Sequence, residues 1–484
     1  MEYFDRFPAY RQWPLEERAV HLPHVPLIAH DTPVMNLGSC FGEYLQLFLD
    51  MYHFNALEPQ AGYKYSCHSI LREIDNAHAN RLTSREQLFF GTSGYTDLNH
   101  HRVYDQDIDA CRAKINAIER NVREALSRTE VIILTPSLIE VWKNRRTDEF
   151  ILHPYPGVLC ESTDLEVHFL TVAENIAYLE STRDLLLRFN PRMQIIVGVC
   201  PTPLRVTYRD EDAVQGNNAS KFTLYAAVNE FCRRHDNVHY FPGYDIVFSE
   251  LAGSRHYMED NRHLAHPAVR HYLRRFGQMF CSEPSQRIMA LLERLAICPP
   301  AEADACLEEL GALGYPADLL HMKTASVRLR GGDGKGAFDS LCRVSMLQES
   351  PALNLNLGLL LREMGFSAKA ATFFGRALDL LHDIPGLSLT MADRAQRIRL
   401  GDNHMKACCN IFDTRRDVLT RMRETARALL RGAPGAQLPP LRGLLFADVP
   451  AQPPFPIGMG AHAAMPEAPP ARTGMPTDCL AGSC

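Results

Sequence analysis

The sequence lacks any stretch that could cross a lipid bilayer, because no run among its 484 residues reaches about 18 uncharged apolar positions. Its first twenty residues also lack the basic start and the apolar run of a secretion signal. A strong charge is missing too: the net charge is −6 and the pI is 6.4, which favours neither nucleic acid nor an anionic membrane as a partner. We therefore expect a soluble, cytoplasmic protein that has no membrane span and binds no nucleic acid.

Paired cysteine motifs are also missing. The 14 cysteines are scattered, and the one adjacent pair is Cys408 and Cys409, so we interpret them as mostly buried, reduced thiols. Histidines gather at 100–101 and 256–271, but no cysteine pair is flanked by histidines at the spacing of zinc ligands. The sequence therefore predicts no metal site and no cofactor.

Between residues 30 and 285, short apolar runs alternate with longer amphipathic stretches. Continuous runs such as VIIL and IIVGV favour strands that are buried on both faces of a parallel sheet. The pattern predicts strands at 34–37, 130–135, 194–200 and 238–241, and helices near 42–52, 67–77, 107–127, 166–189, 218–235 and 265–281. We therefore expect a three-layer α/β domain whose sites lie at the carboxyl ends of its strands.

The rest of the chain has a different character: residues 1–29 form an N-terminal extension, and Pro299 and Pro300 precede a helical region at 300–430. The tail at 432–484 holds 11 of the 31 prolines, and we expect it to be mostly disordered. Part of the helical region resembles tetratricopeptide repeats, and we expect either a repeat surface for a protein partner or, equally, a small helical domain docked on the α/β domain. The residues at the packing positions of such a hairpin are Leu357, Gly358, Leu361, Ala370, Phe374 and Ala377, with a weaker copy at Ala325, Ala337, Leu341 and Val344.

The segment DTPVMNLGSCFGEYLQLFLD carries the strongest chemical signal. An apolar run ends at Gly38, and from Phe41 the apolar residues follow helical spacing, so Ser39 and Cys40 fall on a turn between a strand and a helix. A nucleophile suits this turn, because glycine allows close approach and the N–H groups at a helix start can hold an oxyanion. The same turn also occurs in α/β proteins without any chemistry.

Nucleophilic catalysis also needs a base, and Asp260 precedes His263 by three residues. At this separation the carboxylate can hold the Nδ1–H of the imidazole and leave Nε2 facing a nucleophile. His266 competes for the same role, and we rank it second.

A nucleophile turn after the first strand and an Asp-x-x-His pair before the last helix form an order similar to that of the SGNH (GDSL-type) hydrolase superfamily. More narrowly, the sequence resembles the GSCFA family, whose motif stands here as Gly38-Ser39-Cys40-Phe41, with Gly42 in place of the final alanine. This resemblance covers about residues 30–280 and implies a flavodoxin-like SGNH domain. Further matches in the same order are Gly62, Tyr65, Ser69 and Ile70; Thr135, Glu140 and Val141; Pro201, Asn217, Asn218, Ser220 and Lys221; FPGYDIV at 241–247; and Asp260, His263 and Phe276.

The resemblance also bears on which residue attacks. When Gly-Ser-Cys is laid on the superfamily's Gly-Asp-Ser, Cys40 takes the place of the nucleophile, and we favour it over Ser39. A helix N-terminus and a nearby imidazolium both lower the pKa of a thiol, so a thiolate is plausible here. Ser39 remains open if the turn is shifted by one residue.

The oxyanion donors are implied by the resemblance alone. The backbone N–H of Gly62 would be one donor, together with the N–H of the nucleophile. Ser137 stands where the family has glycine, and the asparagine donor of many superfamily members is missing from this segment. Ser220 and Lys221 either cap and flank a helix that begins at 217 or 218, which we favour, or contact the substrate.

Two further loops carry candidate residues. Arg205 and Tyr208 follow a strand end, where they would select the substrate. His100 and His101 follow Asp97 in GYTDLNHHRVY, and we interpret them either as part of the cleft or, by preference, as solvated loop residues.

The sequence thus predicts an SGNH-like esterase or acyltransferase that acts on an ester, such as the O-acyl group of a small molecule or glycan. Cys40 or Ser39 would be the nucleophile, His263 the general base and Asp260 the residue that orients it. The alternative is a non-catalytic α/β binding module with a helical protein-interaction region, which Ser137 and the missing asparagine favour.

Overall fold

The computed structural model describes residues 20–57, 59, 61–91, 94–100, 103–145, 148–151, 165–252, 256–345, 351–382, 424 and 426–431. The tail at 432–484, for which the sequence predicts disorder, lies outside these residues. Among the described helices, none combines the length and apolar character that a membrane crossing needs.

A five-stranded parallel sheet forms the centre of the α/β domain, with the order β10-β9-β5-β1-β2. Its strands are β1 (Val34–Gly38), β2 (Ala56–Leu57), β5 (Val131–Thr135), β9 (Gln194–Val197) and β10 (Val238–Tyr240). The prediction of a parallel sheet is therefore confirmed. In this order β1 lies beside β5, and the register pairs Gly38 with Thr135 at their carboxyl ends.

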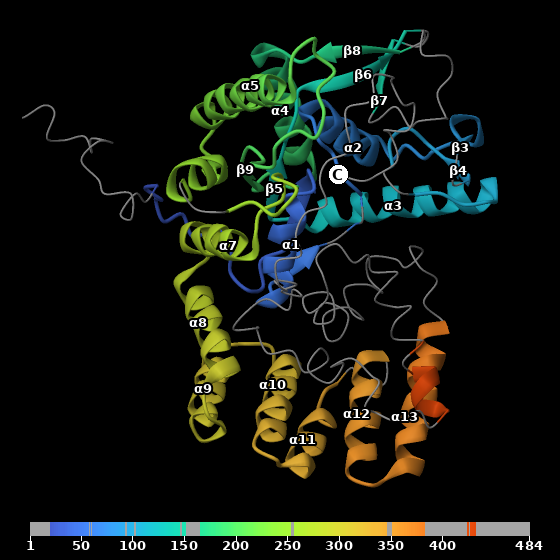
Figure 1. Cartoon of the computed structure of the whole chain (residues 1–484), viewed down its shortest axis with the longest axis vertical. Coiled ribbons are helices and arrows are strands. Elements are labelled where there is room, and N and C mark those ends of the chain that lie inside the picture. The colour runs from blue at the N-terminus through green and yellow to red at the C-terminus, as the bar shows by residue number, and fades with distance from the viewer. Residues whose placement is uncertain are drawn as a thin grey trace, which may run out of the picture.

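Both faces of this sheet are covered, because alternate side chains of each strand belong to different cores. Val34, Val131 and Ile196 pack with α1 (Gly42–Met51) and α7 (His266–Phe280). Met35, Ile132 and Ile195 pack with the helices of the other face. These are α2 (Cys67–Ala79), α3 (Ile108–Arg128), α4 (Val172–Phe189) and α5 (Ala213–Arg234). The domain is therefore a helix–sheet–helix sandwich, as Figure 1 shows.

Two predicted helices begin elsewhere than expected. Residues 166–169 belong to strand β8 (Leu165–Phe169), and α4 begins only after Thr171, whose side chain accepts a hydrogen bond from Glu174 N. The α5 helix begins at Ala213, because Asp212 caps it by accepting from Val214 N and Gln215 N. The helix start predicted at 217 or 218 is therefore wrong, and Ser220 and Lys221 lie inside the helix.

Several short elements were not predicted. The β3 strand (Phe89–Gly91) pairs with β4 (Gly94–Thr96), and β6 (Glu140–Asn144) pairs with both β7 (Glu149–Ile151) and β8 in a second antiparallel sheet. Short helical turns are η4 (Arg85–Gln87), α6 (Gly243–Asp245) and η6 (Ile246–Glu250).

The C-terminal part of the described chain is wholly helical and forms the row of helices below the α/β domain in Figure 1. Its helices are α8 (Glu283–Ile297), α9 (Pro300–Ala312), α10 (Ala317–Arg330), α11 (Gly334–Leu341), α12 (Pro351–Glu363) and α13 (Ser367–His382). The ten residues assigned to packing positions are all buried. Gly358 is needed for this packing, because a Cβ there would lie 2.3 Å from the Phe374 ring.

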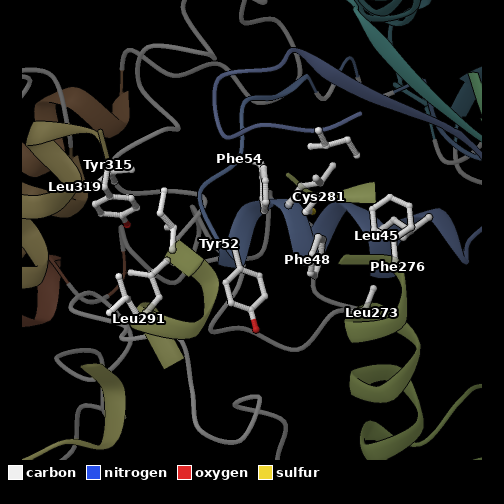
Figure 2. Close-up of a cluster of buried hydrophobic side chains, with 14 of the residues drawn as sticks. Leu45, Phe48, Tyr52, Phe54, Leu273, Phe276, Cys281, Leu291, Tyr315 and Leu319 are labelled. Carbon is white, nitrogen blue, oxygen red and sulfur yellow. The ribbon is translucent and has the colours of Figure 1, made fainter. Parts of the chain in front are cut away.

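The two parts share one apolar core rather than meeting at a polar boundary. Phe48 of α1 and Phe276 of α7 belong to the same buried cluster as Leu291 of α8, and this cluster also contains Tyr315 and Leu319 (Figure 2). The helical region is therefore packed against the α/β domain through side chains that also stabilise the sheet.

Candidate functional site

The turn after β1 is held tightly against the neighbouring strand. Ser39 N donates to Thr135 O at 3.0 Å and to Thr135 Oγ1 at 3.2 Å. A Cβ on Gly38 would lie 2.3 Å from Thr135 Oγ1 and 2.7 Å from Thr135 N, so only glycine permits this approach. The predicted need for a glycine at the turn thus has a direct steric cause.

Gly42, the departure from the family motif, also has a local cause. A Cβ at this position would lie 2.3 Å from Asn36 Nδ2 on β1. The Asn36 side chain therefore occupies the space that the methyl group of an alanine would take.

The two nucleophile candidates differ in access. The Ser39 side chain is only 2% exposed, and its Oγ has no hydrogen-bond partner among the described residues. Cys40 is partly exposed and lines a pocket of about 150 Å³ at the carboxyl ends of the strands. An incoming substrate in this pocket would therefore meet the thiol of Cys40 and not the hydroxyl of Ser39.

Aromatic and cationic side chains surround Cys40 in the pocket. The rings of Trp142 and Tyr208 meet edge to face with their centroids 4.6 Å apart. Arg72, Arg205 and Arg262 also line the pocket. The predicted substrate-selecting residues Arg205 and Tyr208 are thus placed with Cys40, in surroundings that suit a partly apolar, anionic ligand.

Lys221 is fully buried beside the nucleophile turn. Its Nζ donates to Ser137 O at 2.7 Å and to Ser137 Oγ at 3.2 Å. Burial lowers the pKa of Lys221, while electrostatic interactions with the Cys200 and Cys40 thiols oppose that shift. A buried ammonium near Cys40 favours the thiolate form of that cysteine.

The predicted oxyanion and substrate residues differ in their exposure and in their hydrogen bonds. The N–H of Ser137 donates to Tyr65 O at 2.8 Å, so this backbone donor is already engaged, although Ser137 lines the pocket. Gly62 is exposed and has a φ of +72°, a conformation that favours glycine. Ser220 is fully buried, and its Oγ has no hydrogen-bond partner in the described structure.

Asp260 and His263 form the expected pair. Asp260 Oδ2 bonds His263 Nδ1, and Asp260 Oδ1 accepts from the backbone N–H groups of Arg262 and His263, each at 3.0 Å. Partial burial opposes ionisation, but these hydrogen bonds hold the pKa of Asp260 below its usual value. Arg262 of this loop lines the same pocket as Cys40. Its Nε donates to Pro203 O at 3.2 Å. The competing His266 begins α7, and its side chain lies outside the described residues.

The structure also places a second Asp–His pair in a hollow that adjoins the pocket. His100 is only 2% exposed, so the interpretation of His100 as a solvated loop residue is wrong, while His101 lies outside the described residues. His100 Nδ1 lies 2.8 Å from Asp97 Oδ2, and Nε2 lies 3.2 Å from Glu119 Oε1. Burial disfavours the charged ring, but Asp97 outweighs it and raises the pKa of His100 to about 10. Burial also raises the pKa of Glu119.

Lys64 joins this pair to the nucleophile turn. Its Nζ lies 2.9 Å from Glu73 Oε2 and donates to Asn99 O at 3.0 Å, while its backbone N–H donates to Gly38 O at 2.7 Å. Both side chains are buried, with Lys64 1% exposed and Glu73 3% exposed. We name Lys64, Glu73, Asp97, His100 and Glu119 the buried charge cluster.

Sequence reasoning did not single out several of these residues. Arg72, Glu73 and Asn76 line the pocket from α2, together with Ser69, which sequence reasoning named only as a family match. Their spacing of three, four and seven residues is that of one helix face, so periodicity contained a signal for them. Glu119 is one of three acidic residues of the charged helix α3, so composition did not distinguish it from the others.

Comparison with known proteins gives one match. The model of the GSCFA family matches residues 33–276, which is 244 of 484 residues and so just over half of the chain. The search of curated proteins and the search of solved structures found no match. The matched span contains the Gly38–Phe41 turn, the pocket and the Asp260–His263 pair. This protein therefore belongs to the GSCFA family.

Proposed function

We propose that this protein is an SGNH-like esterase or acyltransferase that uses Cys40 as its nucleophile. The observation that carries the proposal is the contrast at the turn, where Cys40 lines the pocket and Ser39 is buried. The proposal is also supported by the strand order, because counting along the chain gives 2-1-3-4-5, the flavodoxin-like order that places sites at strand ends.

In the proposed reaction, Cys40 transfers its proton to Nε2 of His263 and its sulfur attacks the ester carbonyl. The tetrahedral oxyanion collapses, the C–O bond breaks, and the leaving alkoxide takes the proton from His263. Water, or the hydroxyl of an acceptor, then attacks the thioester with His263 as base, which releases the acid or a new ester and restores the thiol. Asp260 holds the ring of His263 in position, and the buried ammonium of Lys221 favours the thiolate.

The lining of the pocket supports a substrate that has an apolar part and an anionic group, while the choice of an O-acyl ester rests on the resemblance to SGNH hydrolases. Trp142 and Tyr208 offer ring faces and edges to an apolar surface, and Arg205 and Arg262 offer charge to an anionic group. We propose an O-acyl ester, such as that of a glycan, as the substrate.

The test is hydrolysis of p-nitrophenyl acetate and O-acetylated oligosaccharides by the full chain. We expect turnover that is lost in Cys40→Ala and in His263→Gln and retained in Ser39→Ala. Turnover that survives Cys40→Ala together with Ser39→Ala, or that survives His263→Gln, would overturn the proposal.

A second candidate is a non-catalytic binding module with a helical partner site. It is favoured by Ser137, whose N–H is engaged by Tyr65 O and so adds no oxyanion donor. In this proposal α9 to α13 act as a tetratricopeptide-like surface for a protein partner. Binding of an O-acylated oligosaccharide without turnover, unchanged by Cys40→Ala, would favour this candidate over the enzyme.

A further inference from the structure

The buried charge cluster suggests a use that the proposed ester chemistry does not need. We propose that Glu73, His100 and Glu119 form a binding site for a divalent metal ion, with Asp97 holding His100 in its ligating orientation. The proposal stands on the geometry of these side chains and does not depend on the proposed function.

The first argument is the convergence of three ligand atoms. One nitrogen of His100 and one carboxylate oxygen each from Glu73 and Glu119 all lie within 4.8 Å of one another. Two ligands of a tetrahedral zinc ion are about 3.4 Å apart, since each lies about 2.1 Å from the metal. Rotation of the two glutamate side chains that brings these atoms about 1–1.5 Å closer would place all three around one ion.

The second argument is that these side chains are buried with polar atoms left over. Glu73, His100 and Glu119 are each 3% exposed or less. Glu73 Oε1 and Glu119 Oε2 have no hydrogen-bond partner among the described residues, and His100 Nε2 is not aligned for a hydrogen bond with Glu119. Burying a carboxylate oxygen without a partner costs free energy. A cation between Glu73, His100 and Glu119 would remove that cost for all three residues.

The third argument is the orientation of His100. Asp97 Oδ2 accepts from His100 Nδ1 at 2.8 Å, and Asp97 Oδ1 accepts from the backbone N–H groups of Asn99 and His100. This carboxylate–histidine pairing fixes the ring and directs Nε2 toward the two glutamates. Metal-binding histidines in proteins commonly have such a partner on the other ring nitrogen.

Charge balance supports a divalent ion. The cluster buries three carboxylates, from Glu73, Asp97 and Glu119, and one lysine, Lys64, whose Nζ bonds the other oxygen of Glu73. Metal binding would displace the proton of His100, and with that ring as a neutral ligand a divalent cation and Lys64 together match the three negative charges. One imidazole with two carboxylates suits zinc or manganese.

The site is also within reach of small ions. Glu73 and Lys64 line the Cys40 pocket, and Asp97, His100 and Glu119 line the adjoining hollow. A metal at this place would lie beside Glu73, which lines the Cys40 pocket, and its proposed ligands do not include the thiol of Cys40.

Metal retention by the full chain tests the proposal. The protein is stripped with a chelator, loaded separately with Zn²⁺ and with Mn²⁺, desalted, and its metal content measured by mass spectrometry. We expect about one equivalent per chain of at least one of the two ions, with that ion raising the melting temperature. Retention of neither ion would overturn the proposal.

Variants separate this site from adventitious binding. Glu119→Gln keeps the shape of the side chain and should lose the bound ion, whereas Asp97→Asn should weaken affinity about 10–100-fold. Glu250→Gln is the matched control, because Glu250 is another buried carboxylate, bonded to His271 and Arg275, far along the chain from the cluster. Equal retention by Glu119→Gln and by wild type would overturn the proposal.

Loss of metal through misfolding is separated by two readouts. Glu119→Gln without metal should melt close to metal-free wild type, because glutamine replaces one carboxylate that lacks a full set of partners. Cobalt-loaded protein should show ligand-field bands but no thiolate-to-cobalt charge transfer, because the proposed ligands hold no sulfur. A thiolate band that persists in Glu119→Gln would mean that cysteines bind the metal, and this also contradicts the proposal.

Discussion

Two Asp-x-x-His segments of this protein have the same local structure in different surroundings. In each, one aspartate oxygen accepts from the backbone N–H groups two and three residues later, and the other bonds Nδ1 of the histidine. The side chain of His263 is 14% exposed on a loop that reaches the pocket, whereas His100 is 2% exposed and faces Glu119. The spacing therefore sets the orientation of the ring, and the tertiary neighbours decide what the ring can do.

The largest expected effect separates the two histidines by activity. His263→Gln should lower kcat/KM for ester hydrolysis by about 10²–10⁴-fold, the usual contribution of a general base, with little change in the melting temperature. The measurement is steady-state hydrolysis together with thermal unfolding. A loss of activity that follows a comparable loss of folded protein would contradict a role for His263 in the chemistry.

The second expected effect reverses that comparison. His100→Gln should lower the free energy of unfolding by about 3–5 kcal/mol, because Asp97 and Glu119 would then be buried without the imidazole that pairs with both. Urea unfolding in the presence of a chelator measures this value, with His263→Gln as the control that should lose less than about 1 kcal/mol. Equal losses in the two variants would break the distinction.

A smaller effect is expected at the aspartates. Asp97→Asn should cost about 1–3 kcal/mol of stability, because it weakens hydrogen bonds to a buried imidazole. Asp260→Asn should cost less, because the Asp260 side chain is 44% exposed and water screens its interactions. Urea unfolding of both variants at neutral pH checks the order, and a larger loss in Asp260→Asn would contradict it.

The smallest effect is a pH dependence. Partial burial raises the pKa of Asp260, but hydrogen bonds from the backbone and from the His263 imidazole outweigh it and lower that pKa in the folded state. Its stabilisation is therefore complete above the ordinary aspartate pKa of about 3.9 and is lost as the pH falls through the lowered value. The difference in unfolding free energy between wild type and Asp260→Asn should stay below about 1 kcal/mol at pH 7 and shrink on acidification. A difference that grows at low pH would have the wrong sign.

Much of the α/β fold was predictable from the sequence, because its central strands are short apolar runs. The runs that became β1 and β5 are buried on both faces. Gly38 ends β1, where Thr135 leaves no room for the Cβ of any other residue. The β8 strand was mistaken for the start of α4, because it pairs antiparallel with β6, a partner that the periodicity of one segment does not reveal.

The candidate site was predictable where chemistry is local and not where it depends on tertiary contacts. The Gly38-Ser39-Cys40 turn and the Asp260–His263 pair depend on spacings of one to three residues. The buried charge cluster joins α2, the loop at 97–100 and α3, so the partnership of Glu73, His100 and Glu119 appears only after folding. The burial of Ser39 beside an accessible Cys40 likewise depends on the neighbouring strand.

The central claim, that Cys40 is the attacking residue, is tested most directly by trapping the acyl group. The full chain is mixed with p-nitrophenyl acetate, quenched in acid and digested, and the peptide that contains Ser39 and Cys40 is sequenced by mass spectrometry. The account predicts an acetyl group on Cys40 that neutral hydroxylamine removes readily, and no such adduct in Cys40→Ala. An acetyl group on Ser39, or steady turnover with no adduct on this peptide, would contradict it.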